Sequence, residues 1–227
     1  MACVLGLAMA GCSDASGEAP PDASSAVFDA ELEKTPCEIM PKKLVAKTFG
    51  IPADEIDETS VLSSKCVYEW EGNEKLLEVS LKVNVLENRD RAADRFHSVT
   101  RGLSAEELSD AMARIAGKAE ETGKLDTEAK KGAAKKMTGA LASGGLHFQE
   151  VEGVGDEARF GARFGTLYVL RGNLKLDLTA YHGPRMPVPE TLSGGSIMKA
   201  AKAWQKETMP VRKQQSVELA KAIVEAL

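Results

Sequence analysis

The chain has 227 residues, of which 29 are Lys or Arg and 34 are Asp or Glu, and its formal net charge is −5 at pH 7. This acidic balance argues against a nucleic-acid partner. The roughly 200 residues that follow the N-terminal segments are enough to bury a sizeable core. We therefore predict a single globular domain over residues 27–227.

The N-terminal residues 1–11 form a short apolar run. The run is about half the length that a membrane-spanning helix needs, so it is typical of a signal peptide. Within it, Met9-Ala10-Gly11-Cys12 resembles a bacterial lipobox. This resemblance implies a mature protein that begins at an acylated Cys12. A second interpretation stays open, because Ala8-Met9-Ala10 has the A-x-A form of an ordinary cleavage site that would release a soluble protein.

Residues 12–26 contain Ser, Ala, Gly, Pro and Asp with almost nothing apolar to bury, which predicts a flexible tether. Several acyl chains on Cys12 would hold such a tether on a membrane, where a single chain is marginal. We expect a lipoprotein of the cell envelope that faces the periplasm or the exterior. Ser13 after the cysteine resembles an outer-membrane sorting signal of Gram-negative bacteria.

Two cysteines remain for the folded domain, Cys37 and Cys66. In an oxidising compartment we expect them to form a disulfide. Closing a loop of this size would stabilise the fold by roughly 3.5 kcal/mol in the chain-entropy model. A redox-active pair usually has the C-x-x-C spacing, which this pair lacks.

Two segments share the pattern Y-x-x-x-G-N, one starting at Tyr68 and the other at Tyr168. Apolar and polar residues alternate after each Gly-Asn pair. Such alternation around Gly-Asn predicts a β-hairpin, because both residues tolerate the positive φ of tight turns. Each hairpin has one apolar and one polar face, so an antiparallel sheet is expected. Helical spacing follows each hairpin, which indicates a repeat offset by about 100 residues.

Further helices are predicted around the hairpins. Pro41 and Gly50 have the residue types of a helix start and stop. Ser104 and Glu107 have capping-box form, with Leu108, Met112 and Ile115 on the expected buried side. Additional helices are expected over residues 126–141, from Ser196 and from Pro210. The predicted fold class is α+β, with an antiparallel sheet from two β-hairpins packed against several helices.

Several motifs together resemble a group of small bacterial envelope lipoproteins of unknown function. They are TPCEIMPKKLVAKTFG from Thr35, Cys66-Val67-Tyr68-Glu69-Trp70, Gly153-Val154-Gly155-Asp156-Glu157-Ala158, and Arg171-Gly172-Asn173. The resemblance implies a fold and a location but no established chemistry.

Motifs for catalysis and cofactors are weak. We expect no catalytic residues, no metal site and no cofactor, because the three histidines lack ligand spacing and no G-x-S-x-G elbow occurs. Gly153–Ala158 is better explained as a turn than as a phosphate loop. Tyr68 and Trp70 share a strand face with Cys66, so core packing beside the disulfide is expected.

The favoured function is a non-enzymatic binding or structural module with an unknown envelope protein or ligand as partner. The alternatives are an exported hydrolase built from Asp156, Glu157 and His182, and an accessory subunit of an envelope complex. Converging acid and base groups in a cleft would favour the hydrolase.

One surface is unusually basic. Lys130, Lys131, Lys135 and Lys136 lie on the outward arc of the predicted helix over residues 126–141. A solvated helix face explains such a stripe most simply. The functional alternative is contact with anionic lipid headgroups or another envelope polyanion.

Overall fold

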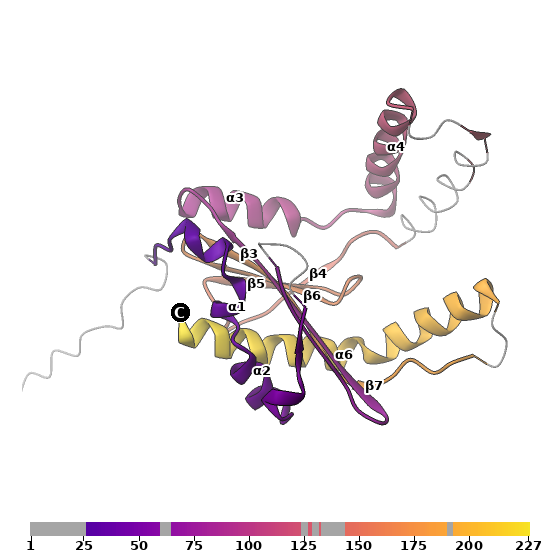
Figure 1. Cartoon of the computed structure of the whole chain (residues 1–227). Coiled ribbons are helices and arrows are strands. Elements are labelled where there is room, and N and C mark those ends of the chain that lie inside the picture. Colours follow the sequence, from indigo (N-terminus) through magenta and orange to yellow (C-terminus); the bar gives the residue numbers. More distant parts are fainter. Residues whose placement is uncertain (1–25, 60–64, 124–126, 129–131, 133–143, 190–192) are drawn as a thin grey trace, which may run out of the picture.

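The computed structural model describes residues 26–59, 65–123, 127–128, 132, 144–189 and 193–227. Within these residues the chain forms a seven-stranded antiparallel sheet of order β1-β2-β3-β7-β6-β5-β4, packed with helices (Figure 1). The predicted α+β class is confirmed. The strands are β1 (Asp57–Glu58), β2 (Lys65–Glu71), β3 (Lys75–Val85), β4 (Phe148–Glu150), β5 (Glu157–Gly161), β6 (Thr166–Arg171) and β7 (Leu174–Pro184). The helices are η2 (Ala30–Glu33), α1 (Pro36–Ile39), α2 (Lys42–Phe49), η3 (Ala53–Glu55), α3 (Arg89–Val99), α4 (Ala105–Glu121) and α6 (Gly194–Ala226).

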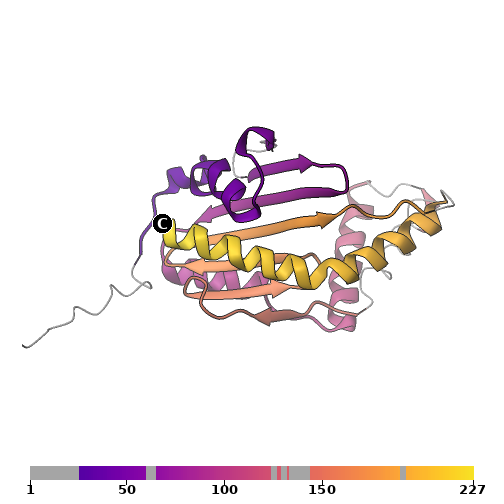
Figure 2. The ribbon, with the colours of Figure 1, turned by 90° about the horizontal axis from the view of Figure 1, so that it is seen from below.

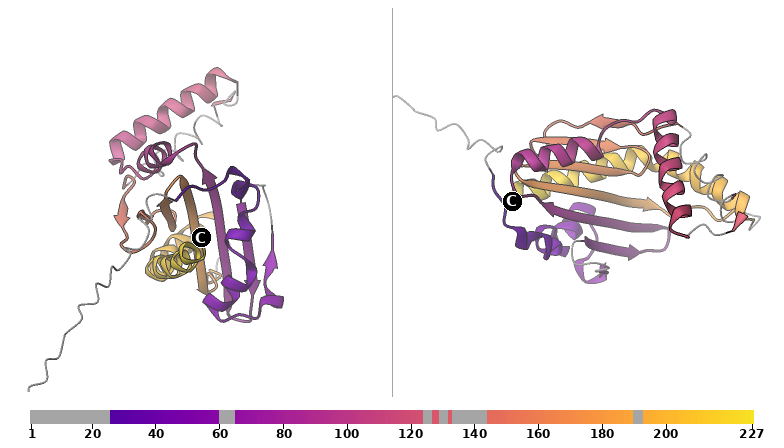
Figure 3. Two further views of the ribbon diagram at one scale, coloured as in Figure 1. Left: turned by 90° about the vertical axis from the view of Figure 1, so that its left-hand side faces the viewer. Right: turned by 90° about the horizontal axis from the view of Figure 1, so that it is seen from above.

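Helices lie on both faces of the sheet. The helices α1, α2 and α6 are on the face that Figure 2 turns toward the viewer, and α3 is on the opposite face, in front in the right-hand view of Figure 3. The main core lies under α6 and α2, where the alternating apolar residues of β3 and β7 meet Val45, Leu219 and Ile223. A smaller core under α3 contains Ala92, Phe96 and Leu170. The alternation in the sequence therefore identified the main core face correctly.

The two predicted hairpins are present and meet at the centre of the sheet. The strands β3 and β7 pair antiparallel along their whole length, with Val79 opposite Ala180 and Ser80 opposite Thr179. An offset of 100 residues relates Val79, which lies in the main core, to Thr179, which pairs with Ser80 on the other face of the sheet. Equivalent positions of the two hairpins therefore face opposite sides of the sheet, and no two-fold axis between β3 and β7 relates them. The helices that follow the two hairpins likewise lie on opposite faces of the sheet, α3 on one and α6 on the other.

The two turns that contain Gly-Asn also differ from each other. Gly172 has the left-handed φ of +56°, and an added Cβ would lie 1.8 Å from the carbonyl oxygen of Ala26. Gly72 is not in that region of φ, and neither asparagine has a positive φ. The shared sequence pattern therefore predicted both turns correctly. The expectation that a positive φ requires the glycine holds for Gly172 and not for Gly72.

The C-terminal helices expected from Ser196 and from Pro210 form one continuous helix, α6. Ser193, not Ser196, is its N-cap and accepts a hydrogen bond from the backbone N–H of Ser196. Pro210 lies inside the helix, where it removes one backbone donor, and α6 changes direction along its length (Figure 1). Proline is also favourable as the first residue of a helix, so Pro210 was wrongly predicted to begin a separate C-terminal helix.

Two further expectations need correction. The helix α4 begins at the predicted capping box of Ser104 and Glu107, but none of its residues is buried and Ile115 is 62% exposed. An amphipathic pattern alone did not ensure that this face packs on the core. The polar face of the second hairpin was expected to be exposed to water, but Lys175 on that face is only 3% exposed and forms an ion pair with Asp177. Its ammonium group also lies 5.5 Å from the ring centroid of Tyr168.

Candidate functional site

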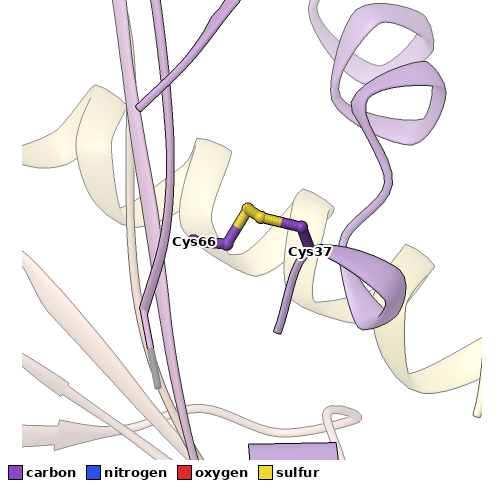
Figure 4. The surroundings of a disulfide bond; sticks show 2 residues. All are labelled: Cys37 and Cys66. Carbon is purple, nitrogen blue, oxygen red and sulfur yellow. A yellow bond between two sulfur atoms is a disulfide. The ribbon is translucent and has the colours of Figure 1, made fainter. Parts of the chain in front are cut away.

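Cys37 and Cys66 form the predicted disulfide, which joins α1 to β2 (Figure 4). Their Cα atoms are 5.1 Å apart, and their positions in the sequence differ by 29. Cys66 has no exposed surface and belongs to the main core. The pair therefore holds the short N-terminal helices against the sheet, and its burial fits a structural disulfide.

The aromatic residues beside the disulfide pack into the core, as expected. Tyr68 is buried, and burial raises its pKa to about 12. Trp70 packs edge-on against His182 with ring centroids 5.8 Å apart, and its indole N–H donates to Glu55 at 3.0 Å. Burial, followed by the charge of Lys75, lowers the pKa of His182. These contacts explain the aromatic side chains by packing.

The segment Gly153–Ala158 is a turn that leads into strand β5, as expected. Gly155 has a φ of +61°, and an added Cβ would lie 2.5 Å from the carbonyl oxygen of Leu170. The Asp156 carboxylate accepts a hydrogen bond from the N–H of Gly172 at 2.8 Å. This hydrogen bond therefore connects the turn to the β6–β7 turn. The motifs Gly153–Ala158 and Arg171-Gly172-Asn173, on which the family resemblance partly depends, thus contact each other in the fold.

The acid and base groups of the alternative hydrolase are not brought together. The Asp156 side chain is 7% exposed and engaged with Gly172, and Glu157 pairs with His97 at 3.0 Å. Through the strand register, Glu157 is opposite Leu170 and Leu170 is opposite Lys175. His182 lies further along β7, at about 23 Å from Lys175 for the usual rise of a strand. These three side chains do not form one site.

Metal-ligating side chains do not cluster in the part of the chain that the structure describes. No group of three or more His, Cys, Asp or Glu side chains there has an arrangement that could hold a metal ion. The described helices include none that is long and apolar enough to span a membrane.

An acidic hollow of about 580 Å³ lies between η3, β1 and the β2–β3 hairpin. Its carboxylates come from Glu55, Asp57, Glu69, Glu71 and Glu78. Three of them already have partners in the protein. Glu55 accepts from Trp70, Glu71 pairs with Arg185 at 3.1 Å, and Glu78 lies 3.9 Å from Arg212. Contacts within the fold therefore account for three of these five carboxylates.

A second hollow of about 490 Å³ has the opposite charge, and we call it the basic hollow. It is lined by Gly144, Gly145, His147, Ala162, Arg163, Lys202, Gln205, Lys206 and Met209. Three Lys or Arg side chains and one histidine face it, and no carboxylate is among the described residues that line it. This concentration of cationic groups in a concave surface favours an anionic ligand.

The walls of the basic hollow are fixed by hydrogen bonds. Arg163 donates to the carbonyl oxygen of Gly145 at 3.1 Å, and Gln205 donates to the carbonyl oxygen of Arg163 at 2.9 Å. Leu103 and Leu146 form a β-bridge that supports the segment of residues 144–147. These contacts therefore hold the β5–β6 turn, residues 144–147 and α6 together around the hollow.

The sequence did not reveal this site. Lys202 and Lys206 are one helical turn apart, which is a visible signal, but solvated lysines on helices commonly have this spacing. Arg163 and His147 come from segments that are distant from these lysines in the sequence. Only the pairing of β4, β5 and β6 brings those segments beside α6.

The remaining predicted site residues lie outside the described residues. These are the expected lipidation site Cys12 and the basic stripe of Lys130, Lys131, Lys135 and Lys136, with most of the helix expected over residues 126–141. They stay predictions from the sequence.

The fold and its sites define an antiparallel α+β domain with a buried disulfide and a cationic hollow. Comparison of the chain with family models, with curated proteins and with solved structures found no match.

Proposed function

We propose that this protein is a lipid-anchored module of the bacterial cell envelope that binds a partner or ligand without catalysing a reaction. The observation that supports this proposal most directly is the buried Cys37–Cys66 disulfide. Such bonds persist in exported proteins and are rare in a reducing cytosol. The disulfide therefore agrees with the leader and the lipobox-like cysteine at the N-terminus.

The arrangement of the polar groups supports binding over hydrolysis. His182 lies far from Asp156 and Glu157, and each of the three side chains is engaged in contacts within the fold. The basic hollow, in contrast, gathers cationic side chains that face a shared space. A site that attracts charge without a paired nucleophile and base is suited to binding.

Metabolic labelling with a palmitate analogue in a bacterial host tests the anchor. We expect the wild-type chain to carry the label and to fractionate with the envelope, and Cys12→Ala to lose the label. Cys3→Ala is the matched control, because it removes another cysteine of the N-terminal region and should keep the label. An unlabelled wild-type chain, or equal labelling of Cys12→Ala, would overturn the proposed anchorage.

A further inference from the structure

We propose that the basic hollow binds the phosphate of an anionic phospholipid. The inference deepens the proposed function and rests on it, since a membrane anchor would keep this surface close to lipid headgroups. Three properties of the site carry the inference: its charge, the apolar residues beside it and its position relative to the tether.

The charge of the hollow suits a phosphate group. Lys202 and Lys206 are exposed and lie on one face of α6, and Arg163 faces them from the β5–β6 turn. Arg163 is held by Gly145, so its guanidinium is positioned without a ligand. Lys213 extends the basic face of α6 by about two further turns and donates to Gln149 of β4 at 2.8 Å. A lysine near an anionic lipid surface strengthens binding by about fivefold.

Apolar side chains accompany this charge in the way that a lipid surface requires. Ala162 and Met209 form part of the lining. Phe164 follows Arg163 and is 57% exposed, and Met198 precedes Lys202 by one helical turn and is 61% exposed. Exposed large apolar residues beside lysines are typical of surfaces that enter the headgroup region of a membrane. A free inorganic anion would make no use of them.

The position of the hollow allows it to reach the membrane that carries the anchor. Ala26 lies against Gly172 of the β6–β7 turn, and the hollow lies at the other end of β6, beside the β5–β6 turn. A strand with the length of β6 spans about 20 Å. The segment from Cys12 to Ala26 can span at most about 50 Å when fully extended. The tether can therefore bring this end of the domain to the same bilayer.

Binding to vesicles tests the inference without the acyl chains. The full chain carrying Cys12→Ser is mixed with phosphatidylglycerol vesicles and, separately, with phosphatidylcholine vesicles, and the bound fraction is measured by sedimentation. We expect clear preference for phosphatidylglycerol, and about 25-fold weaker binding for Lys202→Ala/Lys206→Ala. Phe164→Ser should weaken binding by about tenfold, since it removes an apolar side chain from the contact.

The matched control is Lys43→Ala/Lys47→Ala, which removes two exposed lysines at the same spacing from α2. We expect this variant to bind within about twofold of the parent. Equal losses in both double variants would show that total charge and not the hollow decides binding, and would overturn the inference. Binding of inorganic phosphate in the absence of vesicle binding, measured by calorimetry, would also overturn the lipid assignment.

The proposed membrane anchor and the proposed lipid site can be refuted independently of each other. The vesicle experiment uses a chain without Cys12, so its outcome does not depend on acylation. A labelled, envelope-associated protein whose hollow variants bind vesicles like the parent would refute the lipid site alone.

Discussion

Asn173 joins three segments of the chain through one side chain. Its amide oxygen accepts from the N–H of Phe28 at 2.7 Å, and its amide nitrogen donates to the carbonyl oxygens of Phe28 and Leu86, each at 3.0 Å. Asn173 is 4% exposed, so water cannot easily replace it. We predict that Asn173→Ala lowers the free energy of unfolding by about 2–4 kcal/mol, measured by urea denaturation.

Asn73 provides the matched control, because it occupies the same position in the Gly-Asn turn of the other hairpin and is exposed. Asn73→Ala should change the free energy of unfolding by less than about 0.5 kcal/mol. Similar losses in the two variants would mean that the turn itself, and not the contacts to Phe28 and Leu86, makes Asn173 important.

His182 gives the fold a dependence on pH. Burial holds its pKa in the folded state below the usual 6.5, so the unfolded chain takes up a proton more readily. The contribution of His182 to stability is therefore complete above about pH 6.5 and decreases as the pH falls toward the folded pKa. We predict that His182→Gln flattens the decrease in unfolding free energy between about pH 7 and pH 5. Identical pH profiles for the variant and the parent would contradict this expectation.

The helix α6 completes the sheet as well as covering it. Strand β6 pairs with β7 only as far as Leu178, so the next residues of β7 lack a strand on that side. Gln215 of α6 takes this place: its side chain accepts from the N–H of His182 and donates to the carbonyl oxygen of His182, both at 2.8 Å. Ser216 accepts from the N–H of Ala180 at 3.1 Å. Side chains of a helix thus satisfy the backbone of an otherwise open strand edge.

We predict that Gln215→Ala lowers the free energy of unfolding by about 1–3 kcal/mol, because it leaves two backbone groups of His182 without their partner. Hydrogen exchange should show faster exchange of the His182 amide. The neighbouring Gln214 is exposed and bonds only to Glu218 in the described contacts, so Gln214→Ala is the control and should be close to neutral. Unchanged exchange at His182 in Gln215→Ala would argue against this function of α6.

The elements differ in how far the sequence could predict them. Alternation located β3 and β7, and cap residues located α2 and α4, because these signals act within a few residues. The burial of Lys175 depends on α3 packing across this face of the sheet, and the exposure of Ile115 depends on α4 leaving the sheet. The basic hollow likewise depends on three segments that meet only in the fold. Local signals contain no information on such contacts.

In the molecule as a whole, the disulfide fastens the N-terminal helices to the sheet. Residues 30–56 form η2, α1, α2 and η3 and cover the apolar face of the sheet near β2 and β3. This segment contributes Met40, Val45 and Ile56 to the main core, although it contains no strand of the hairpins. Its attachment therefore depends on these contacts and on the bond from Cys37 to Cys66.

We predict that Cys37→Ala/Cys66→Ala lowers the free energy of unfolding by roughly 3.5 kcal/mol, because the unfolded chain gains the freedom that the closed loop had removed. Dithiothreitol should lower the melting temperature of the parent and leave that of the double variant unchanged. Cys3→Ala is the control, since Cys3 precedes the folded domain and should leave the response to reductant intact. If the double variant were as stable as the parent, the apolar contacts of Met40, Val45 and Ile56 would be sufficient to hold the N-terminal helices on the sheet. The disulfide would then be a mark of an oxidising compartment that does not contribute to the stability of the fold.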